Sequence, residues 1–342
     1  RGGGSRGNAR GDRGRGRSFD DRGDRDRPGF EDDDGFGGPT TRSVWQDRHD
    51  EKKRVREETG RSTLAETLVG EAVFGLNPVR EALLAKRRQI HKVWVQEGAD
   101  GILGDRQILS GCDALGLQIT TVSKHDLNML VNQGGGSGRP HNGVVIDASA
   151  LEPVPIDSLP KWNPPSPSSE GKKNNPPPIW LALDEVVDPQ NLGAILRTAK
   201  FLGVSGVVVC AKNSAPLSPV VSKASSGALE SFPIKSVGVM HRFLQRCAED
   251  GWDVFGASGG DRGAEDVTAI HKIDKPSVLV MGNEGAGLRT NVRRACTRTI
   301  EVAKMNGIGN DDATDETSVD SLNVSVATGI ILHALLSAAR RE

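Results

Sequence analysis

The second half of the chain alternates short apolar runs with segments of helical periodicity. The apolar runs predict five strands, at residues 179–183, 206–209, 252–255, 277–281 and 299–302. The periodic segments between them predict five helices, at residues 190–202, 218–229, 239–249, 288–295 and 321–340. Because a helix separates most consecutive strands, this order predicts a mainly parallel sheet covered on both faces. Such sheets bind ligands in the loops at the carboxyl ends of their strands.

A smaller α/β pattern precedes this region. Asn77 and Pro78 are typical of a helix start, with Asn as the cap and Pro at the first position. The pattern then predicts strands and helices in alternation, at residues 90–95, 106–115, 117–122 and 143–146, with a short helix after Ser123 and a glycine-rich loop at 134–138. We therefore expect a small α/β domain over residues 71–150.

Two segments have no such pattern. Residues 1–70 are rich in Arg, Gly and Asp without a hydrophobic period, which predicts a disordered tail and linker. The Arg/Gly-rich first part suggests weak RNA contact, and a solvated tail is the alternative. Residues 151–178 are rich in proline and predict an extended linker that does not pack. The large α/β domain then spans residues 179–342.

The net charge of the chain limits how it can bind nucleic acid. The 342 residues include 44 Lys and Arg against 45 Asp and Glu, a formal net charge of -1, which excludes a uniformly basic nucleic-acid binder but not a local basic patch. Five basic side chains cluster at one predicted helix-to-strand connection and are candidate RNA contacts: Lys86, Arg87, Arg88, His91 and Lys92. The alternative for this cluster is a solvated edge.

The cysteines and the apolar runs exclude further classes. The four cysteines form no CxxC pair, so we expect neither a cysteine-rich zinc site nor a disulfide framework. No apolar run reaches the roughly 18 residues of a membrane span, so no membrane association is expected. The chain begins with Arg1 rather than Met, which suggests that the natural N-terminus, with any targeting peptide, lies further upstream.

The first motif with chemical content runs from Asp184 to Arg197, where a strand ends, an acidic loop turns and a helix begins. Gly193 and Arg197 are four residues apart and share a helix face. A glycine beneath an arginine suggests room for a ligand to approach the guanidinium. The alternative is an ordinary surface arginine on a helix that Asp188 caps.

Two later motifs also lie beside predicted strand or helix ends. Residues 278–288 form an apolar strand that runs into a glycine-rich turn without the Lys-Ser/Thr of a Walker A loop, and Glu284 lies inside this turn. Residues 321–330 open an apolar helix, with Ser321 and Asn323 at its N-terminus, where free N–H groups favour polar or anionic groups. Simple helix capping is the alternative for these two residues.

In this order, the strings NLGAILR, MGNEGAGL and SLNVSVATG resemble the signature motifs of the SpoU/TrmH family of RNA 2′-O-methyltransferases, within the SPOUT class. The resemblance implies an α/β fold with a C-terminal trefoil knot, and a small N-terminal α/β domain that binds RNA. Phe74-Gly75 and His141-Asn142-Gly143 are similar to the landmarks of that small domain.

The resemblance also implies an activity. The family transfers a methyl group from S-adenosylmethionine (SAM) to a ribose 2′-hydroxyl, without a metal and as a homodimer. The two-domain form resembles the members that methylate a guanosine of large-subunit ribosomal RNA. A transfer-RNA ribose methyltransferase and a catalytically inactive RNA-binding assembly factor are the alternatives. The additions to a bacterial-type enzyme suggest an organelle, either mitochondrion or chloroplast, and otherwise the cytoplasm.

By motif position, the resemblance implies a set of catalytic residues: Arg197, Asn191, Glu284, Ser321 and Asn323. It implies a second set that holds SAM: Gly282, Val302 and Leu322, with Ala257 and Ser258 as further candidates. Residues 304–319 form an insertion relative to the family pattern and abut the expected SAM pocket.

Overall fold

The computed structural model describes residues 64–133, 138–163, 176–259, 263–304 and 321–341. All of them belong to one compact unit that spans residues 62–342. The predicted tail before residue 64 and nearly all of the insertion at 304–319 lie outside the described residues. Residues 64–67, which the sequence assigned to the tail and linker, form a short 3₁₀ helix, η1 (Leu64–Thr67).

A four-stranded sheet forms the core of the small domain. Its strands, in spatial order, are β1 (Glu71–Phe74), β4 (Val144–Ala148), β2 (Ile90–Gln96) and β3 (Ile119–Val122). Only β2 and β3 run parallel. The helices are α2 (Leu76–Ala85), α3 (Asp100–Leu103), α4 (Arg106–Leu115) and α5 (Lys124–Gln133). In β2, Val93 and Val95 pack with α2 and α4, whereas Trp94 packs with α5 on the opposite face.

Helix caps explain why the predicted bounds of α4 are correct and the predicted start of α2 is wrong. The bounds of α4 match the prediction because the Asp105 side chain accepts from the N–H groups of Gln107 and Ile108, and left-handed Gly116 ends the helix. The expected start of α2 at Asn77 is wrong, because Gly75 is the N-cap. The Asn77 amide instead donates to the Ser226 hydroxyl at 2.8 Å.

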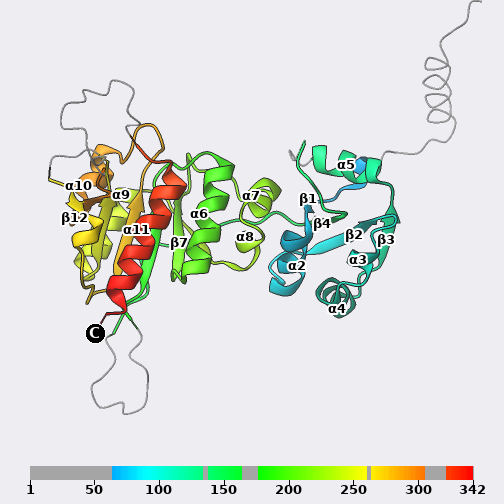
Figure 1. Ribbon diagram of the computed structural model, residues 1–342, viewed down its shortest axis with the longest axis horizontal. Helices are drawn as coiled ribbons and strands as arrows, with labels where there is room; N and C mark the ends of the chain where they lie inside the picture. Colours follow the sequence, from blue (N-terminus) through cyan, green and yellow to red (C-terminus); the bar gives the residue numbers. More distant parts are fainter. Residues whose placement is uncertain (1–63, 134–137, 164–175, 260–262, 305–320, 342) are drawn as a thin grey trace, which may run out of the picture. The chain divides into compact units, whose positions relative to one another are not determined.

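The large domain is built on an eight-stranded sheet in which every pair is parallel, which confirms the predicted fold class (Figure 1). In spatial order the strands are β10 (Glu265–Asp266), β12 (Arg298–Glu301), β9 (Asp253–Ala257), β11 (Ser277–Met281), β6 (Ile179–Leu183), β7 (Gly206–Cys210), β8 (Ile234–Val237) and β5 (Val154–Pro155). Three of these, β5, β8 and β10, were not predicted.

Helices cover both faces of this sheet. They are α6 (Pro189–Leu202), α7 (Pro219–Ala224), α8 (Ala228–Ser231), α9 (Met240–Glu249), α10 (Thr290–Arg294) and α11 (Val324–Ala339), with a 3₁₀ turn η2 (Val267–Ala269). Figure 1 shows α6 and α11 side by side, and the two are in contact. The single helix expected over 218–229 is interrupted, because Ser226 and Gly227 adopt left-handed backbone angles between α7 and α8.

The segment expected to be an unpacked linker packs in part. Leu151 and Leu159 are buried in the two core clusters on opposite faces of the large sheet. Between them, β5 pairs with β8 at the sheet edge, where Pro155 costs no ladder hydrogen bond. The expectation of no packing is therefore wrong for residues 151–159, because apolar residues between the prolines anchor the chain. Residues 164–175 lie outside the described part.

The trefoil knot stays a prediction. After β12 the chain leaves the sheet near its edge, and α11 returns to pack against α6 and β11. The threading of this return depends on residues 305–320, which lie outside the described ranges.

The role expected for Gly193 is wrong. A Cβ at Gly193 would lie 2.4 Å from the Cβ of Ala224 and 3.1 Å from its carbonyl carbon. The glycine therefore lets α6 and α7 approach closely, and it does not open space around Arg197. The Arg197 side chain is exposed.

The predicted basic cluster separates into buried and exposed members. The side chains of Arg88 and Glu230 are both 0% exposed, and two nitrogens of Arg88 donate to the Glu230 carboxylate at 2.7 and 3.1 Å. Arg88 also donates to Glu71 at 2.9 Å and to the carbonyl of Ser149 at 2.7 Å. The expectation that Arg88 contacts RNA is therefore wrong, because its charge is used inside the protein.

One nitrogen of Arg87 is also engaged, because it donates to the carbonyl oxygens of Leu229, Glu230 and Phe232 at 2.9 to 3.3 Å. Lys86 and Lys92 are exposed and His91 is half-buried. An RNA contact by these three side chains stays a prediction.

The Gly193 contact predicts a stability effect. Gly193→Ala should destabilise the protein by about 1–3 kcal/mol, because the added methyl group forces α6 and α7 apart. The measurement is urea denaturation of the full chain. Gly329→Ala in α11 is the matched control: its Cβ would lie 3.6 Å from Thr198, an ordinary contact, and should change stability by about 1 kcal/mol or less, in the stabilising direction. Equal effects of the two changes would contradict the packing role of Gly193.

The buried ion pair predicts a second effect. Arg88→Met should cost about 3–5 kcal/mol, because it leaves the Glu230 carboxylate buried without its cation. Lys92→Met, on the exposed surface, should shift the unfolding free energy by about 0.5 kcal/mol or less. The double change Arg88→Met with Glu230→Gln should recover part of the loss. Arg88→Met at wild-type stability would show that the pair is not needed for the fold.

Candidate functional site

Three polar side chains from distant parts of the chain meet at the carboxyl edge of the large sheet. Asn191 lies in the first turn of α6, Glu284 in the glycine-rich loop after β11, and Asn323 is the N-cap of α11. The Asn191 amide donates to Glu284 Oε2 at 2.8 Å, and the Asn323 amide donates to Glu284 Oε1 at 2.8 Å and to Asn191 Oδ1 at 3.0 Å. We call these three residues the Glu284 triangle.

The orientation of each amide in the Glu284 triangle follows from its other contacts. The Asn323 oxygen accepts from the N–H of Ser325 at 2.9 Å and from its hydroxyl at 2.6 Å, so the Asn323 nitrogen must face the carboxylate. Asn191 is buried, whereas Glu284 and Asn323 are open to solvent. Because each carboxylate oxygen has two acceptor sites and accepts one of these amide bonds, Glu284 can still accept from a ligand hydroxyl.

The loop that carries Glu284 is closed on itself. Asn283 and Gly287 exchange backbone hydrogen bonds at 2.9 and 3.0 Å, and the Asn283 side chain accepts from the N–H groups of Gly285 and Ala286. A Cβ at Gly282 would lie 2.3 Å from the Gly287 carbonyl carbon, so only glycine fits where the loop folds back. This closure gives Glu284 a defined position beside β6.

An ion pair beneath the loop adds a second support, which the sequence analysis missed. Arg289 pairs with the fully buried Asp184 through two nitrogens and with Glu185 at 3.0 Å. The hydrogen bonds that Arg289 donates to the Asp184 carboxylate raise the pKa of Arg289. The available signal was positional, because Asp184 directly follows a buried strand and Arg289 directly follows the glycine-rich turn.

Three cysteines of the large domain have thiols that are not nucleophiles at neutral pH. Burial raises the pKa of the Cys210 thiol to about 11, with the charge of Asp184 adding to the effect. Burial raises the pKa of Cys247 and Cys296 to about 12. All three are therefore protonated at neutral pH, and all four cysteines are free thiols.

Arg197 does not join the Glu284 triangle within one chain. It lies six residues after Asn191, about 9 Å along α6 and on a different helix face. In the part of the chain that the structure describes, its guanidinium forms no hydrogen bond or ion pair. It lines a groove of about 410 Å³ between α6 and α11, together with Thr198, Phe201, Leu202, Gly329 and His333.

The residues expected to hold SAM follow three neighbouring strands. Ala257 ends β9 and Ser258 follows it, Gly282 follows β11, and Val302 follows β12. Leu322 is exposed beside Asn323. A SAM-binding role for these residues stays a prediction. So does a catalytic role for Ser321, whose hydroxyl makes no hydrogen bond to the Glu284 triangle within the described ranges.

Two further expectations concern metals and membranes. Among the described residues, no group of three or more His, Cys, Asp or Glu side chains is arranged to hold a metal ion. None of the helices in the described ranges is long and apolar enough to cross a membrane.

Comparison with known proteins identifies two matching family models and several similar sequences. Residues 178–333 match the model of the SpoU rRNA Methylase family, and residues 72–154 match the model for RNA 2′-O ribose methyltransferase substrate binding. The chain is 33% identical over 276 residues to "rRNA methyltransferase 1, mitochondrial" of Homo sapiens, covering 78% of this chain and 72% of the relative.

Two other relatives extend the comparison. The Dictyostelium discoideum protein named "rRNA methyltransferase 1, mitochondrial" is 37% identical over 251 residues, which cover 68% of this chain but only 44% of that protein. The Coxiella burnetii "23S rRNA (guanosine-2′-O-)-methyltransferase RlmB" is 32% identical over 267 residues, covering 77% of this chain and 93% of the relative.

The solved structures agree on the fold. The SpoU methyltransferase AviRb from Streptomyces viridochromogenes, in complex with the cofactor AdoMet, superimposes with a TM-score of 0.55 at 20% identity, covering 78% of this chain and 88% of that one. At this identity the likeness concerns the fold alone. Together with the family models and the relatives, it leads to one conclusion: the chain belongs to the SpoU rRNA methylase family.

Proposed function

We propose that this protein transfers a methyl group from SAM to the ribose 2′-hydroxyl of a guanosine in mitochondrial large-subunit ribosomal RNA. The names of the relatives support the ribosomal RNA, the guanosine and the mitochondrion. The single observation that carries the proposal is the Glu284 triangle, a pre-formed polar site at the ligand-binding edge of the parallel sheet.

The ends of β9 and β12 fit the donor. Ala257, Ser258 and Val302 are half-buried and uncharged, which suits a neutral adenine ring. When bound, SAM supplies a methyl group on a positively charged sulfur. This part of the site excludes water from one side and orients the donor toward the Glu284 triangle.

The Glu284 triangle acts on the methyl acceptor. The ribose 2′-hydroxyl is a poor nucleophile and must be held in position to attack. Two amide donors hold the Glu284 carboxylate in one orientation. Its free acceptor sites can take a hydrogen bond from the 2′-hydroxyl and direct an oxygen lone pair at the methyl group. Placement of this kind supplies much of the rate in a displacement that needs in-line geometry.

Arg197 enters the proposal through a homodimer. It projects from an apolar face of α6 and α11, where Phe201 is 87% exposed, Val326 50% and Ile330 41%. Exposed apolar residues grouped in this way favour an interface with another protein surface. We place a second copy there, so that each Arg197 reaches the Glu284 triangle of the opposite copy and holds a phosphate beside the reacting ribose.

A transfer experiment tests the proposed function. The full chain is incubated with methyl-labelled SAM and either ribosomal or transfer RNA, and the modified ribose is located by its resistance to alkaline cleavage. We expect label at one guanosine of the large-subunit RNA. Label in transfer RNA alone would favour the transfer-RNA alternative. RNA binding without any transfer would favour the inactive assembly factor, and either result overturns the proposal.

A mixing experiment tests the dimer and Arg197 together. Arg197→Ala should lower kcat by about 10²–10⁴-fold, because the phosphate and hydroxyl lose an orienting donor, while SAM affinity measured by calorimetry stays unchanged. Glu284→Gln should also be nearly inactive. Mixed and re-equilibrated, the two variants should recover about a quarter of the wild-type activity, because half of the dimers then hold one intact site.

Two controls accompany the mixing experiment. Phe201→Asp should yield a monomer by light scattering and lose transfer. No recovery on mixing, with dimers present, would show that Arg197 does not act across the interface.

A further inference from the structure

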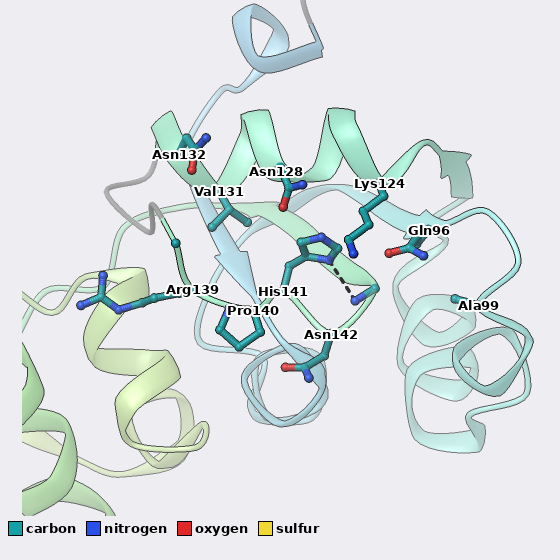
Figure 2. Close-up of a pocket in the computed structure, with 12 residues that line it drawn as sticks. Gln96, Ala99, Lys124, Asn128, Val131, Asn132, Arg139, Pro140, His141 and Asn142 are labelled. Carbon is teal, nitrogen blue, oxygen red and sulfur yellow. Dashed lines mark hydrogen bonds between the residues drawn. The ribbon is translucent and has the colours of Figure 1, made fainter.

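A second cavity lies in the small domain, far along the sequence from the Glu284 triangle (Figure 2). Its volume is about 540 Å³, within the range of small-ligand pockets. It lies between α5, the end of β2 and the turn before β4. Its lining residues are Gln96, Ala99, Lys124, Asn128, Val131, Asn132, Gly138, Arg139, Pro140, His141, Asn142 and Gly143.

His141 is a buried residue that lines this cavity and offers it a hydrogen-bond donor. The side chain is 5% exposed, and Figure 2 shows its ring between Asn128 and Lys124. Its Nδ1 accepts from the N–H of Gly143 at 2.9 Å, so in the neutral ring the hydrogen is on Nε2. Within the described ranges Nε2 has no hydrogen-bond partner. Burial, and then the charges of Lys124 and Lys223, lower the pKa of His141, which favours the neutral form of the ring.

The turn that aims His141 is constrained. Asn142 and Gly143 follow one another with φ of 53° and 81°, both in the left-handed region. A Cβ at Gly143 would lie 2.7 Å from Ile102, and the Gly143 carbonyl accepts from the N–H of Gln96 at 2.8 Å. Gly143 adopts this conformation freely, whereas in Asn142 it is uncommon for a residue with a side chain, and together the two residues fix the turn that carries the imidazole.

The charge and chemistry of the lining favour one class of ligand. No Asp or Glu is among the lining residues. Lys124 is the first residue of α5, where its positive charge opposes helix stability and adds to the positive end of the helix dipole. Gln96, Asn128 and Asn132 carry side-chain amides that both donate and accept. The cavity thus offers two cations, Lys124 and Arg139, mixed hydrogen bonding and the apolar surfaces of Val131 and Pro140.

We propose that this cavity binds one unpaired nucleotide of the RNA substrate. The base lies against His141 and Val131 and pairs its edge with the amides, and its phosphate contacts Lys124. Proteins read single-stranded RNA in this way, by taking up splayed-out bases and bonding to their edges. The inference rests on the proposed function and adds a recognition site remote from the reacting ribose.

The test uses the full chain and single-stranded RNA oligonucleotides of about 12 nucleotides, tiled across the large-subunit RNA. In the oligonucleotide that binds best, each base is removed in turn. Removal of the captured base should weaken binding to the wild-type protein about tenfold, with smaller effects elsewhere. Asn128→Ala should bind the intact RNA about tenfold more weakly and should no longer respond to removal of that base.

Matched variants separate the cavity from general charge. Lys124→Ala should weaken RNA binding, whereas Arg106→Ala, which removes an exposed cation at the start of α4, should not. Gln107→Ala is the corresponding control for Asn128→Ala. All four residues are exposed, so the changes leave the core intact. Equal effects of Lys124→Ala and Arg106→Ala, or no position sensitive to base removal, would overturn the proposal.

Methyl transfer distinguishes failure of this inference from failure of the proposed function. Lys124→Ala and Asn128→Ala should raise the KM for RNA about tenfold at an unchanged kcat. If methyl transfer occurs at the wild-type rate but no base-specific binding is found, only the inference about the cavity is overturned. Base-specific binding without any transfer would overturn the proposed function alone. Guanosine monophosphate that binds as tightly as the best oligonucleotide would assign the cavity to a free nucleotide and also overturn the inference.

Discussion

The hydrogen bonds that Asn191 and Asn323 donate to the Glu284 carboxylate bring together three distant segments of the large domain. β6 and β11 pair in register, with Leu183 opposite Met281, so the loops after them open side by side. Asn323 reaches the same place only because α11 returns to the middle of the sheet, which brings together two asparagines 132 residues apart in the chain. Beneath them, the pairing of Arg289 with buried Asp184 neutralises a charge that would otherwise destabilise this edge.

The same geometry separates Arg197 from this contact. The helix that buries Asn191 turns Arg197 outward within six residues, onto an apolar surface shared with α11. The direction of α6 therefore accounts both for the position of Asn191 in the Glu284 triangle and for the exposure of Arg197. Six residues after Asn191, Arg197 lies on a different face of α6 and cannot reach the site that Asn191 anchors, and in the proposed dimer the second copy supplies this arginine.

The basic residues of the small domain divide by burial rather than by position along the chain. Arg88 lies beside Arg87 and Lys86, yet its guanidinium is satisfied internally by Glu230 and Glu71. A buried charge needs its counter-charge, so it is unavailable to an RNA phosphate. The polar cavity around His141 is lined mainly by uncharged donors and acceptors, with Lys124 and Arg139 as its two cations, a composition suited to a base more than to a run of phosphates.

The sequence by itself determined most of the helices and the central strands, the parallel arrangement of the large sheet and the polar residues at its carboxyl edge, but not the short strands β5, β8 and β10. These follow from local rules, namely hydrophobic period, the caps at Asp105 and Asp188, and glycine-rich turns after buried strands. Only the tertiary structure decided which residue meets which. Gly193 fits against Ala224, and Arg88 pairs with a carboxylate 142 residues away. Hydrophobic period and capping depend on residues a few positions apart. Packing partners depend on the path of the whole chain, so no local pattern predicts them.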